Sequence, residues 1–415
     1  MRFPPVRPLA SIAVLLVGLG QFAAVQAQSW SANSLGTLDG SFVGPVTFAD
    51  TGIGIGQAFV ANGAGTAFSY SGSSIGDLTS LSGASGGAFF VNAAGQVAGQ
   101  SYAPGTSSNQ AFLYSGGSFN NIGTLGGSGS YVTGLNASGE VVGYSNEAGN
   151  ASTHAFVYNN GNIVDLHTLG GSTSSAVAVN NNGQVVGDSY TTGDASSHAF
   201  LYNAGQMSDL GTLADGSNSA ATAINSAGMV IGTSSLTYNG VVNGATHAFI
   251  YAAGVMTDLT PGAAGSTAIA INASGQVIGN ETLTGNTATH AYLFGNGQIK
   301  DLGTLGGANS YAVAVNSLGD VVGLSTVAGS TAQHSFLYAN GKMIDLNAMF
   351  PTLSNFVVTG INDAMQIIGT ATDAATGTVR AYIVSAVPES DGASLTLAGF
   401  ALLGWIARRR RVTRA

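Results

Sequence analysis

The chain has 415 residues and 62 glycines, but charged residues make up only 7% of it and it contains no cysteine. The absence of cysteine excludes disulfides, thiolate metal sites and thiol nucleophiles. Between residues 28 and 387 only three basic residues accompany 17 acidic ones. Such a surface could not neutralise a run of phosphates, so the composition argues against a nucleic-acid partner.

The N-terminus has the layout of a secretory signal peptide. Arg2 and Arg7 precede a short apolar run over residues 9–20, and Val25-Gln26-Ala27 offers a cleavage site after Ala27. This pattern predicts export, with residues 1–27 removed. The alternative, an N-terminal membrane anchor, is weaker because the apolar run is short for a span.

From about residue 35 to residue 386 the chain repeats one unit eight times. A pentad of the type His-Ala-Phe-Leu-Tyr marks each unit at a spacing close to 44 residues, and the eight copies begin at Thr66, Gln110, His154, His198, His247, His290, His334 and Arg380. A fixed period of this length means that one supersecondary unit is used throughout the fold.

The seventh unit predicts four short strands, each rich in Val, Ile, Phe or Tyr and closed by Gly or Asn. They are expected at residues 311–315, 320–325, 334–338 and 342–345. Asn340-Gly341 predicts a tight hairpin between the last two strands, because both residues tolerate positive φ. No segment shows sustained helical periodicity, so the unit is expected to be all-β.

Four strands per unit of this length are typical of a β-propeller blade, so we predict an all-β propeller of eight four-stranded blades over residues 28–386. The last unit lacks a fourth strand, and residues 28–33 stand where one is needed. An N-terminal strand that completes the last blade would close the ring and leave no open sheet edge. Two alternatives stay open: seven blades, with the degenerate first unit as a cap, and an open β-solenoid.

A second motif, Asn-x-x-Gly-x-Val-Val-Gly, precedes the second strand of the units, for example from Asn180 to Gly187 and from Asn316 to Gly323. Together with the triplet His154-Ala155-Phe156 and its copies, this motif resembles the extracellular repeats of the HAF family over nearly all of residues 35–386. The resemblance implies secretion or surface placement and implies no established activity.

Five of the six histidines occupy the first pentad position, and an aspartate follows each one about 11 residues later, at the end of the fourth strand. The pairs are His154 and Asp165, His198 and Asp209, His247 and Asp258, His290 and Asp301, and His334 and Asp345. A hairpin of this size could bring the two side chains within hydrogen-bonding reach, so we predict a structural lock in each blade. Metal binding and catalysis are the weaker interpretations, because histidines at equivalent positions on different blades need not lie close enough to share one site. No metal ligand, cofactor or catalytic residue is predicted.

Variable loops precede the pentads at residues 145–153, 188–197, 234–246, 280–289 and 325–333. In a propeller these loops lie on one rim, and their Asn, Thr, Ser, Tyr and Gly residues suit hydrogen bonds to sugar hydroxyls, although they could equally be solvated connectors. The predicted function is therefore a non-catalytic structural or carbohydrate-binding module. The competing class is a polysaccharide-acting enzyme with its site in the central channel, which a cluster of ionisable side chains there would favour.

The C-terminus, residues 387–415, has the layout of a sorting signal. Pro388 and Glu389 precede a polar spacer and a short apolar span, followed by Arg408, Arg409, Arg410 and Arg411. The tail resembles the PEP-CTERM signal of Gram-negative, exopolysaccharide-producing bacteria, although Ser390 stands where that family usually has a second proline. The resemblance implies transient insertion in the inner membrane, processing near Pro388-Glu389 by an exosortase-type enzyme, and delivery to the cell surface or extracellular matrix. The alternative is a plain single-pass tail anchor.

Overall fold

The computed structural model describes residues 30–35, 43–49, 51, 53–59, 65–71, 74–77, 86–102, 108–213, 216–238, 241–285, 288–374 and 376–386. The predicted signal peptide and the predicted sorting signal, with Pro388, Glu389 and Arg408 to Arg411, lie outside these residues. The chain divides into two compact units, Ala32–Ser385 and Met1–Ser31 with Ala386–Ala415, and only residues 30, 31 and 386 of the latter are described. None of the described helices is long and apolar enough to cross a membrane.

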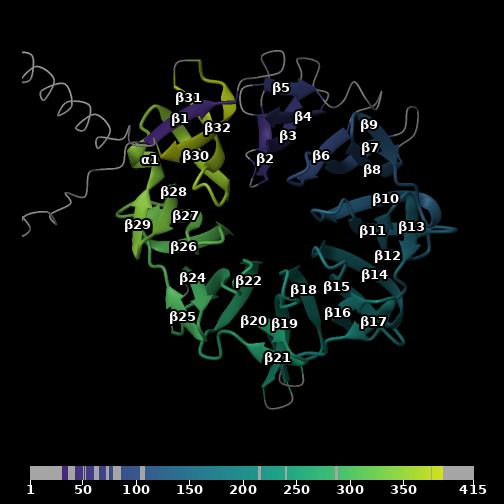
Figure 1. The fold of residues 1–415 in the computed structure, drawn as a ribbon. Helices are drawn as coiled ribbons and strands as arrows, with labels where there is room; N and C mark the ends of the chain where they lie inside the picture. Colours follow the sequence, from purple (N-terminus) through teal and green to yellow (C-terminus); the bar gives the residue numbers. More distant parts are fainter. Residues whose placement is uncertain are drawn as a thin grey trace, which may run out of the picture. The chain divides into compact units, whose positions relative to one another are not determined.

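The described strands form eight four-stranded antiparallel sheets, which Figure 1 shows arranged in a ring. The first strand of each unit faces the centre of the ring, and these strands are β2 (Val43–Phe48), β6 (Gly86–Val91), β10 (Gly126–Leu135), β14 (Gly170–Val179), β18 (Ser219–Ile224), β22 (Gly265–Ile271), β26 (Gly306–Val315) and β30 (Leu353–Ile361). The second strands are β3 (Ile53–Phe59), β7 (Val97–Tyr102), β11 (Val141–Glu147), β15 (Val185–Thr191), β19 (Val230–Tyr238), β23 (Val277–Thr282), β27 (Val321–Val327) and β31 (Ile367–Asp373).

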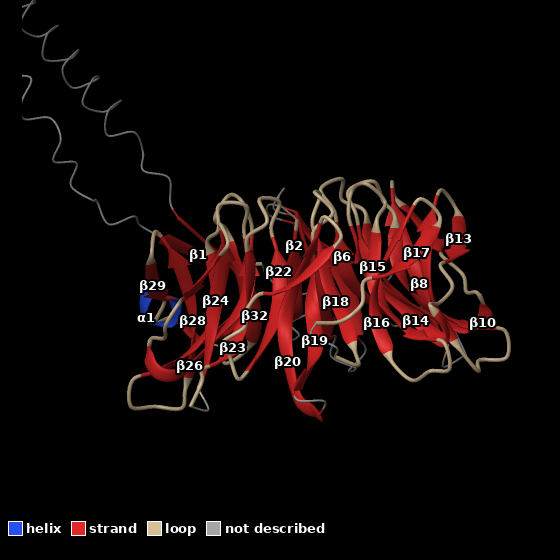
Figure 2. Ribbon diagram, turned by 90° about the horizontal axis from the view of Figure 1, so that it is seen from below, coloured by secondary structure: helices blue, strands red, loops and turns tan. Residues whose placement is uncertain are grey.

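The third strand of each unit carries the pentad, and these strands are β4 (Gly65–Ser71), β8 (Asn109–Ser115), β12 (Thr153–Asn159), β16 (Ser197–Asn203), β20 (Val241–Ala252), β24 (Thr289–Gly295), β28 (Gln333–Ala339) and β32 (Val379–Ala386). The outermost strands are β5 (Ser74–Asp77), β9 (Ser118–Asn121), β13 (Asn162–Asp165), β17 (Gln206–Asp209), β21 (Val255–Asp258), β25 (Gln298–Asp301) and β29 (Lys342–Asp345), and in the last sheet β1 (Trp30–Ser34). The strands run between two rims of loops, as the edge-on view in Figure 2 shows.

The N-terminal strand closes the ring, as the sequence predicted. The last sheet has the order β1-β32-β31-β30, so β1 supplies the fourth strand that the eighth unit lacks. The Leu35 backbone N–H extends this pairing by donating to the Ala381 carbonyl at 2.9 Å. On the other side of the junction, β2 of the first sheet contacts β30 and β31 of the last. These contacts confirm the eight-bladed propeller and do not fit an open solenoid.

The seventh unit shows how closely the folded strands follow the local sequence pattern. The fourth strand, β29, has the predicted bounds, and Asn340 and Gly341 adopt the expected positive φ of 52° and 77°. The first strand, β26, begins at Gly306 rather than at residue 311, because an irregular pairing with β27 between Gly306 and Ser310 extends it. One short helix, α1 (Leu346–Met349), was not expected; the Asp345 side chain caps it by accepting from the Ala348 N–H.

The hydrophobic core lies between neighbouring sheets, not within one. Val142 and Ala155 of the third sheet form one buried cluster with Val185 and Phe200 of the fourth. All four side chains are fully buried. Alternation along the pentad places Phe on one face of the sheet and Ala on the other. Each unit therefore supplies the aromatic half of one interface and the small half of the next, so the pentad phenylalanines pack blade against blade.

The last glycine of the turn motif makes this packing feasible. A Cβ built on Gly187 would lie 1.9 Å from the Ser175 carbonyl oxygen and 2.9 Å from the ring of Phe200. At Gly143 and Gly323, the equivalent positions, a Cβ would meet the same two kinds of atom at 3.1 Å or less. The aromatic ring lies directly over the second strand, and only glycine leaves room for it.

The first asparagine of the turn motif joins neighbouring blades. Asn180 Nδ2 donates to the Asn225 carbonyl at 3.0 Å, while Asn136 Nδ2 donates to the Asn180 carbonyl at the same distance. Equivalent bonds start from the other copies of this residue, at Asn92, Asn225, Asn272 and Asn316. The side-chain oxygen meanwhile accepts two backbone N–H groups of its own turn, at Asn182 and Gln184 for Asn180. The result is a buried asparagine ladder that runs from blade to blade, which the sequence pattern did not predict.

Candidate functional site

The pentad histidines and the variable loops share one rim of the propeller. Strand pairing sets this arrangement, because His198 at the start of β16 lies opposite Ser189 near the end of β15. The loop that joins these two strands, and Asp209 at the end of β17, are then at the same end of the sheet. We call this the loop rim; the asparagine ladder lies on the opposite rim.

The structure brings together all five His–Asp pairs named from the sequence. The distance from histidine Nδ1 to aspartate Oδ2 is 3.1 Å for His154 and Asp165 and 2.8 Å in each of the other pairs, namely His198 and Asp209, His247 and Asp258, His290 and Asp301, and His334 and Asp345. Asp209 Oδ1 also accepts the Gly211 N–H at 2.7 Å, and the other four aspartates accept a backbone N–H in the same way. Each aspartate thus ties the third strand to the connection that enters the next blade.

The second unit makes the same tie with different residues. Asn121 Nδ2 donates to Gln110 Oε1, and Asn121 Oδ1 accepts the Gly123 N–H at 2.8 Å. Gln110 stands in the pentad position of the histidines and Asn121 in that of the aspartates. An uncharged amide pair therefore fits the same geometry, which favours a structural role for these positions over an acid–base role.

We expect Asp209→Ala to lower the free energy of unfolding by about 1–2 kcal/mol, because a hydrogen bond to His198 and one to a backbone N–H are both lost. The double variant His198→Gln with Asp209→Asn, which copies the second unit, should recover most of this loss. Urea unfolding followed by circular dichroism measures both. An Asp209→Ala protein with the stability of the wild type would show that the His198–Asp209 pair does not stabilise the fold.

A pocket of about 360 Å³ opens on the ladder rim, at the inner ends of the first five blades. Its described lining consists of Ala49, Val91, Asn92, Ala93, Leu135, Asn136, Ala137, Val179, Asn180, Asn181, Ile224 and Ser226, and none of these side chains titrates. The side-chain amides of Asn92, Asn136 and Asn180 already donate to the carbonyl groups of the ladder. The described lining of this pocket therefore offers no general acid or base.

Another pocket, of about 400 Å³, lies on the loop rim where the fifth, sixth and seventh blades meet. We call it the loop-rim pocket; its lining is Ala245, Thr246, Gly265, Ser266, Thr267, Asn280, Thr282, Thr289 and Tyr311. Two of the five predicted recognition loops, 234–246 and 280–289, contribute to it, and the described residues of the other three do not. The Ala312 N–H donates to Asn280 Oδ1 at 2.9 Å and so fixes the orientation of that amide.

Two acidic side chains on this rim are held partly away from water. Burial raises the pKa of Glu281, which stands between the pocket residues Asn280 and Thr282; Asp301 adds to the rise and His290 opposes it. Burial also raises the pKa of Asp188, against the opposing effect of the Ser197 hydroxyl, which donates to it at 3.3 Å. Neither carboxyl lines the loop-rim pocket, whose own groups are hydroxyl, amide, methyl and phenol.

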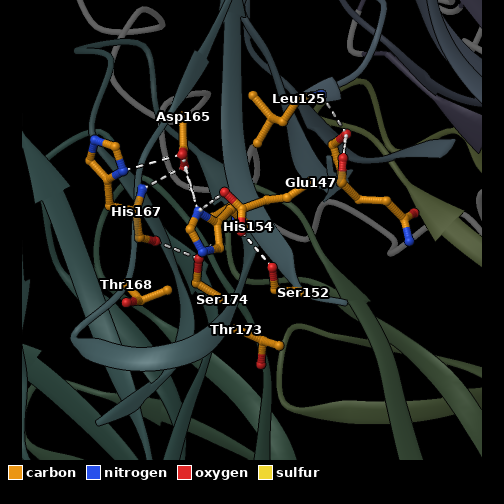
Figure 3. Close-up of polar contacts among 12 residues, drawn as sticks. Leu125, Glu147, Ser152, His154, Asp165, His167, Thr168, Thr173 and Ser174 are labelled. Carbon is orange, nitrogen blue, oxygen red and sulfur yellow. Dashed lines mark hydrogen bonds and ion pairs between the residues drawn. The ribbon is translucent and has the colours of Figure 1, made fainter. Parts of the chain in front are cut away.

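Sequence reasoning missed one residue on this rim, His167. The connection after the third sheet reads Leu166-His167-Thr168-Leu169, whereas the equivalent segments that begin at Leu35, Leu210 and Leu302 read Leu-Gly-Thr-Leu. His167 Nδ1 lies 3.2 Å from Asp165 Oδ2, beside the His154 pair, as Figure 3 shows. The signal was present in the sequence as the one histidine outside the pentads.

The fold and these sites define a β-propeller built from sequence repeats. No protein-family model and no curated protein matches the chain. Among solved structures it is similar to a prolyl endopeptidase (10% identity, TM-score 0.51, 82% of this chain and 55% of that one) and to the β-propeller domain of the trilobed protease from Pyrococcus furiosus (10% identity, TM-score 0.47, 74% and 97%). It is also similar to the GH74 xyloglucanase from Xanthomonas campestris (11% identity, TM-score 0.44, 83% and 60%). At these identities the likeness shows the fold alone, and the chain spans only about half of the endopeptidase.

Proposed function

We propose that this protein is an exported, non-catalytic propeller that binds neutral carbohydrate at the cell surface or in the extracellular matrix. The observation that carries the proposal is the loop-rim pocket, in which two recognition loops meet the phenol of Tyr311. Export, exosortase processing and contact with exopolysaccharide are parts of the proposal that rest on the motifs of residues 1–27 and 387–415.

The chemistry of the pocket suits a sugar. Sugar hydroxyls both donate and accept hydrogen bonds, and so do the hydroxyls of Thr246, Thr282 and Thr289 and the amide of Asn280. The face of a sugar ring is made of C–H groups, for which the ring of Tyr311 offers an apolar surface. Because the lining carries no carboxylate or ammonium group, a neutral polyhydroxyl ligand fits it better than an ionic one.

The competing interpretation, a polysaccharide-acting enzyme, lacks support at the place where it was expected. Most glycoside hydrolases use a pair of carboxyl groups on either side of the bond that is cut. The described lining of the channel pocket consists of Asn, Ala, Ser and aliphatic side chains. This composition favours binding over turnover.

A glycan array probed with the purified protein, together with a turnover assay on the same glycans, tests the proposal. We expect binding to neutral polysaccharide fragments and no cleavage products. Tyr311→Ala should weaken that binding more than tenfold, because the stacking surface is lost. Tyr190→Ala is the matched control, since Tyr190 is an exposed tyrosine on the same rim of another blade, outside the pocket. Absence of binding would leave a purely structural role, whereas turnover would favour the enzyme.

A further inference from the structure

Four side chains with metal-ligand atoms converge at the loop rim of the third blade. His154 Nδ1 lies 3.1 Å from both carboxylate oxygens of Asp165 and 3.3 Å from Glu147 Oε1, and His167 Nδ1 lies 3.2 Å from Asp165 Oδ2 (Figure 3). One ligand atom each from His154, Asp165 and His167 fall within 4.8 Å of one another. Two ligands of a tetrahedral zinc ion, each at about 2.0 Å from the metal, are about 3.3 Å apart. We call these four side chains the third-blade cluster. The contacts of Asp165 with His154 and with His167 are close to that ligand spacing, and Glu147 joins the cluster through its contact with His154.

Hydrogen bonds among these side chains do not compensate the negative charge of the third-blade cluster. An imidazole Nδ1 carries at most one hydrogen, yet His154 Nδ1 faces the carboxylates of both Asp165 and Glu147. The two carboxylates also repel each other across this nitrogen. A divalent cation would balance both charges and would accept lone pairs from both imidazoles.

We propose that the third-blade cluster binds one divalent transition-metal ion, of which Zn²⁺ is the best match. Imidazole nitrogen with carboxylate oxygen is a donor set that zinc favours. The ion would join the end of β11, the start of β12, the end of β13 and the connection into β14. Its role would be that of a structural staple between one blade and the link to the next.

The other blades lack the residues that this site needs. The position of His167 is held by Gly211, Thr260, Gly303 and Asn347 in the other units with a His–Asp pair. The position of Glu147 is held there by Thr191, Leu236, Leu283 and Val327. A His–Asp pair is thus common to five blades, and the second imidazole and second carboxylate occur together in one of them.

The backbone at His167 supports a role for its side chain. Its φ is 61°, in the left-handed region, and Gly123, Gly211 and Gly303 adopt φ of 83°, 73° and 74° at the same position. A residue with a Cβ is strained in this conformation, whereas glycine is not. A bound ion would offset the strain that the histidine introduces.

Neighbouring groups orient the ligands and leave one side of the site open. Ser152 Oγ donates to Glu147 Oε2, and the His167 N–H donates to Asp165 Oδ1 at 2.7 Å. Such outer bonds fix the geometry of ligands in metal sites. The His154, Asp165 and Glu147 side chains are 15%, 25% and 33% exposed, and that of His167 is 78% exposed. The ion would therefore enter from the solvent on the side of His167.

Titration of the EDTA-treated full-length protein with ZnCl₂, by calorimetry and by thermal unfolding, tests the proposal. We expect one Zn²⁺ per chain and a higher Tm with the ion than without it. His167→Gly should weaken binding more than tenfold and abolish the rise in Tm. Without zinc, the same variant should unfold at or above the Tm of the wild type, because glycine is unstrained there.

The control is His198→Gln, which alters the His–Asp pair of the fourth blade and should leave zinc affinity unchanged. The proposal is overturned if the wild type binds no zinc, if His167→Gly binds it as tightly, or if His198→Gln loses it equally. The last outcome would assign the zinc to His–Asp pairs in general.

Discussion

Gly187→Ala is expected to lower the free energy of unfolding by at least about 3 kcal/mol, the largest single effect that the structure predicts. The added Cβ would lie 1.9 Å from the Ser175 carbonyl oxygen, 2.8 Å from Ala176 Cα and 2.9 Å from the Phe200 ring. Two of these atoms belong to the backbone of β14 and cannot rotate away. The innermost strand and the aromatic ring would both have to shift, which disrupts the sheet ladder and the interface with the third blade.

Urea unfolding followed by circular dichroism measures this loss. Gly262→Ala is a matched control, because it adds the same methyl group at a glycine with no atom within 4 Å of the new Cβ and without positive φ. It should change stability by less than about 0.5 kcal/mol. Similar midpoints for Gly187→Ala and the wild type would contradict the packing described for every blade interface.

Asn180→Ala is expected to cost about 3 kcal/mol, because it removes a buried group that serves four partners. Asn180 Nδ2 donates to the Asn225 carbonyl at 3.0 Å and to Gln184 Oε1 at 2.7 Å. Its Oδ1 accepts the N–H groups of Asn182 and Gln184, each at 3.0 Å. Without the side chain these groups stay buried and partly unpaired, and the join between the fourth and fifth blades loses its ladder bond.

Asn182→Ala separates this effect from a general loss of asparagine. Asn182 lies in the same turn and also reaches the next blade, through a bond from Nδ2 to the Ser226 carbonyl at 2.9 Å, but this bond is exposed to water. We expect the loss at Asn182 to be below about 1 kcal/mol, since water replaces the partner. Thermal or urea unfolding measures the stability of both variants. Equal losses of stability for Asn180→Ala and Asn182→Ala would argue that burial of the ladder does not contribute to stability.

Much of the fold could be predicted from local pattern. Period, strand number and the Asn340-Gly341 hairpin follow from alternation and turn chemistry within about ten residues, and the structure reproduces them in β28 and β29. The early start of β26 could not be predicted, because it depends on how Gly306 and Ser310 pair with β27. Neither could α1, which is a single turn capped by Asp345.

Part of the candidate site could also be predicted from local pattern. A histidine and an aspartate 11 residues apart on one hairpin meet whenever the hairpin forms, as His198 and Asp209 do. His167 was overlooked because its importance depends on His154 and Glu147, which the folded sheet brings to the same cluster through Asp165 and His154. The loop-rim pocket likewise needs three blades in place before Thr246, Asn280 and Tyr311 share one surface.

The sequence by itself determined that the chain is all-β, that one unit is used eight times, and that residues near the N-terminus complete the last blade. Only the tertiary structure decided that the asparagine of each turn holds the next blade, as Asn136 holds the carbonyl of Asn180, 44 residues away. The physical reason is distance along the chain. Turns and strands arise from neighbours in sequence, whereas the ladder, the loop-rim pocket and the third-blade cluster arise where ring closure and strand pairing bring separate segments together.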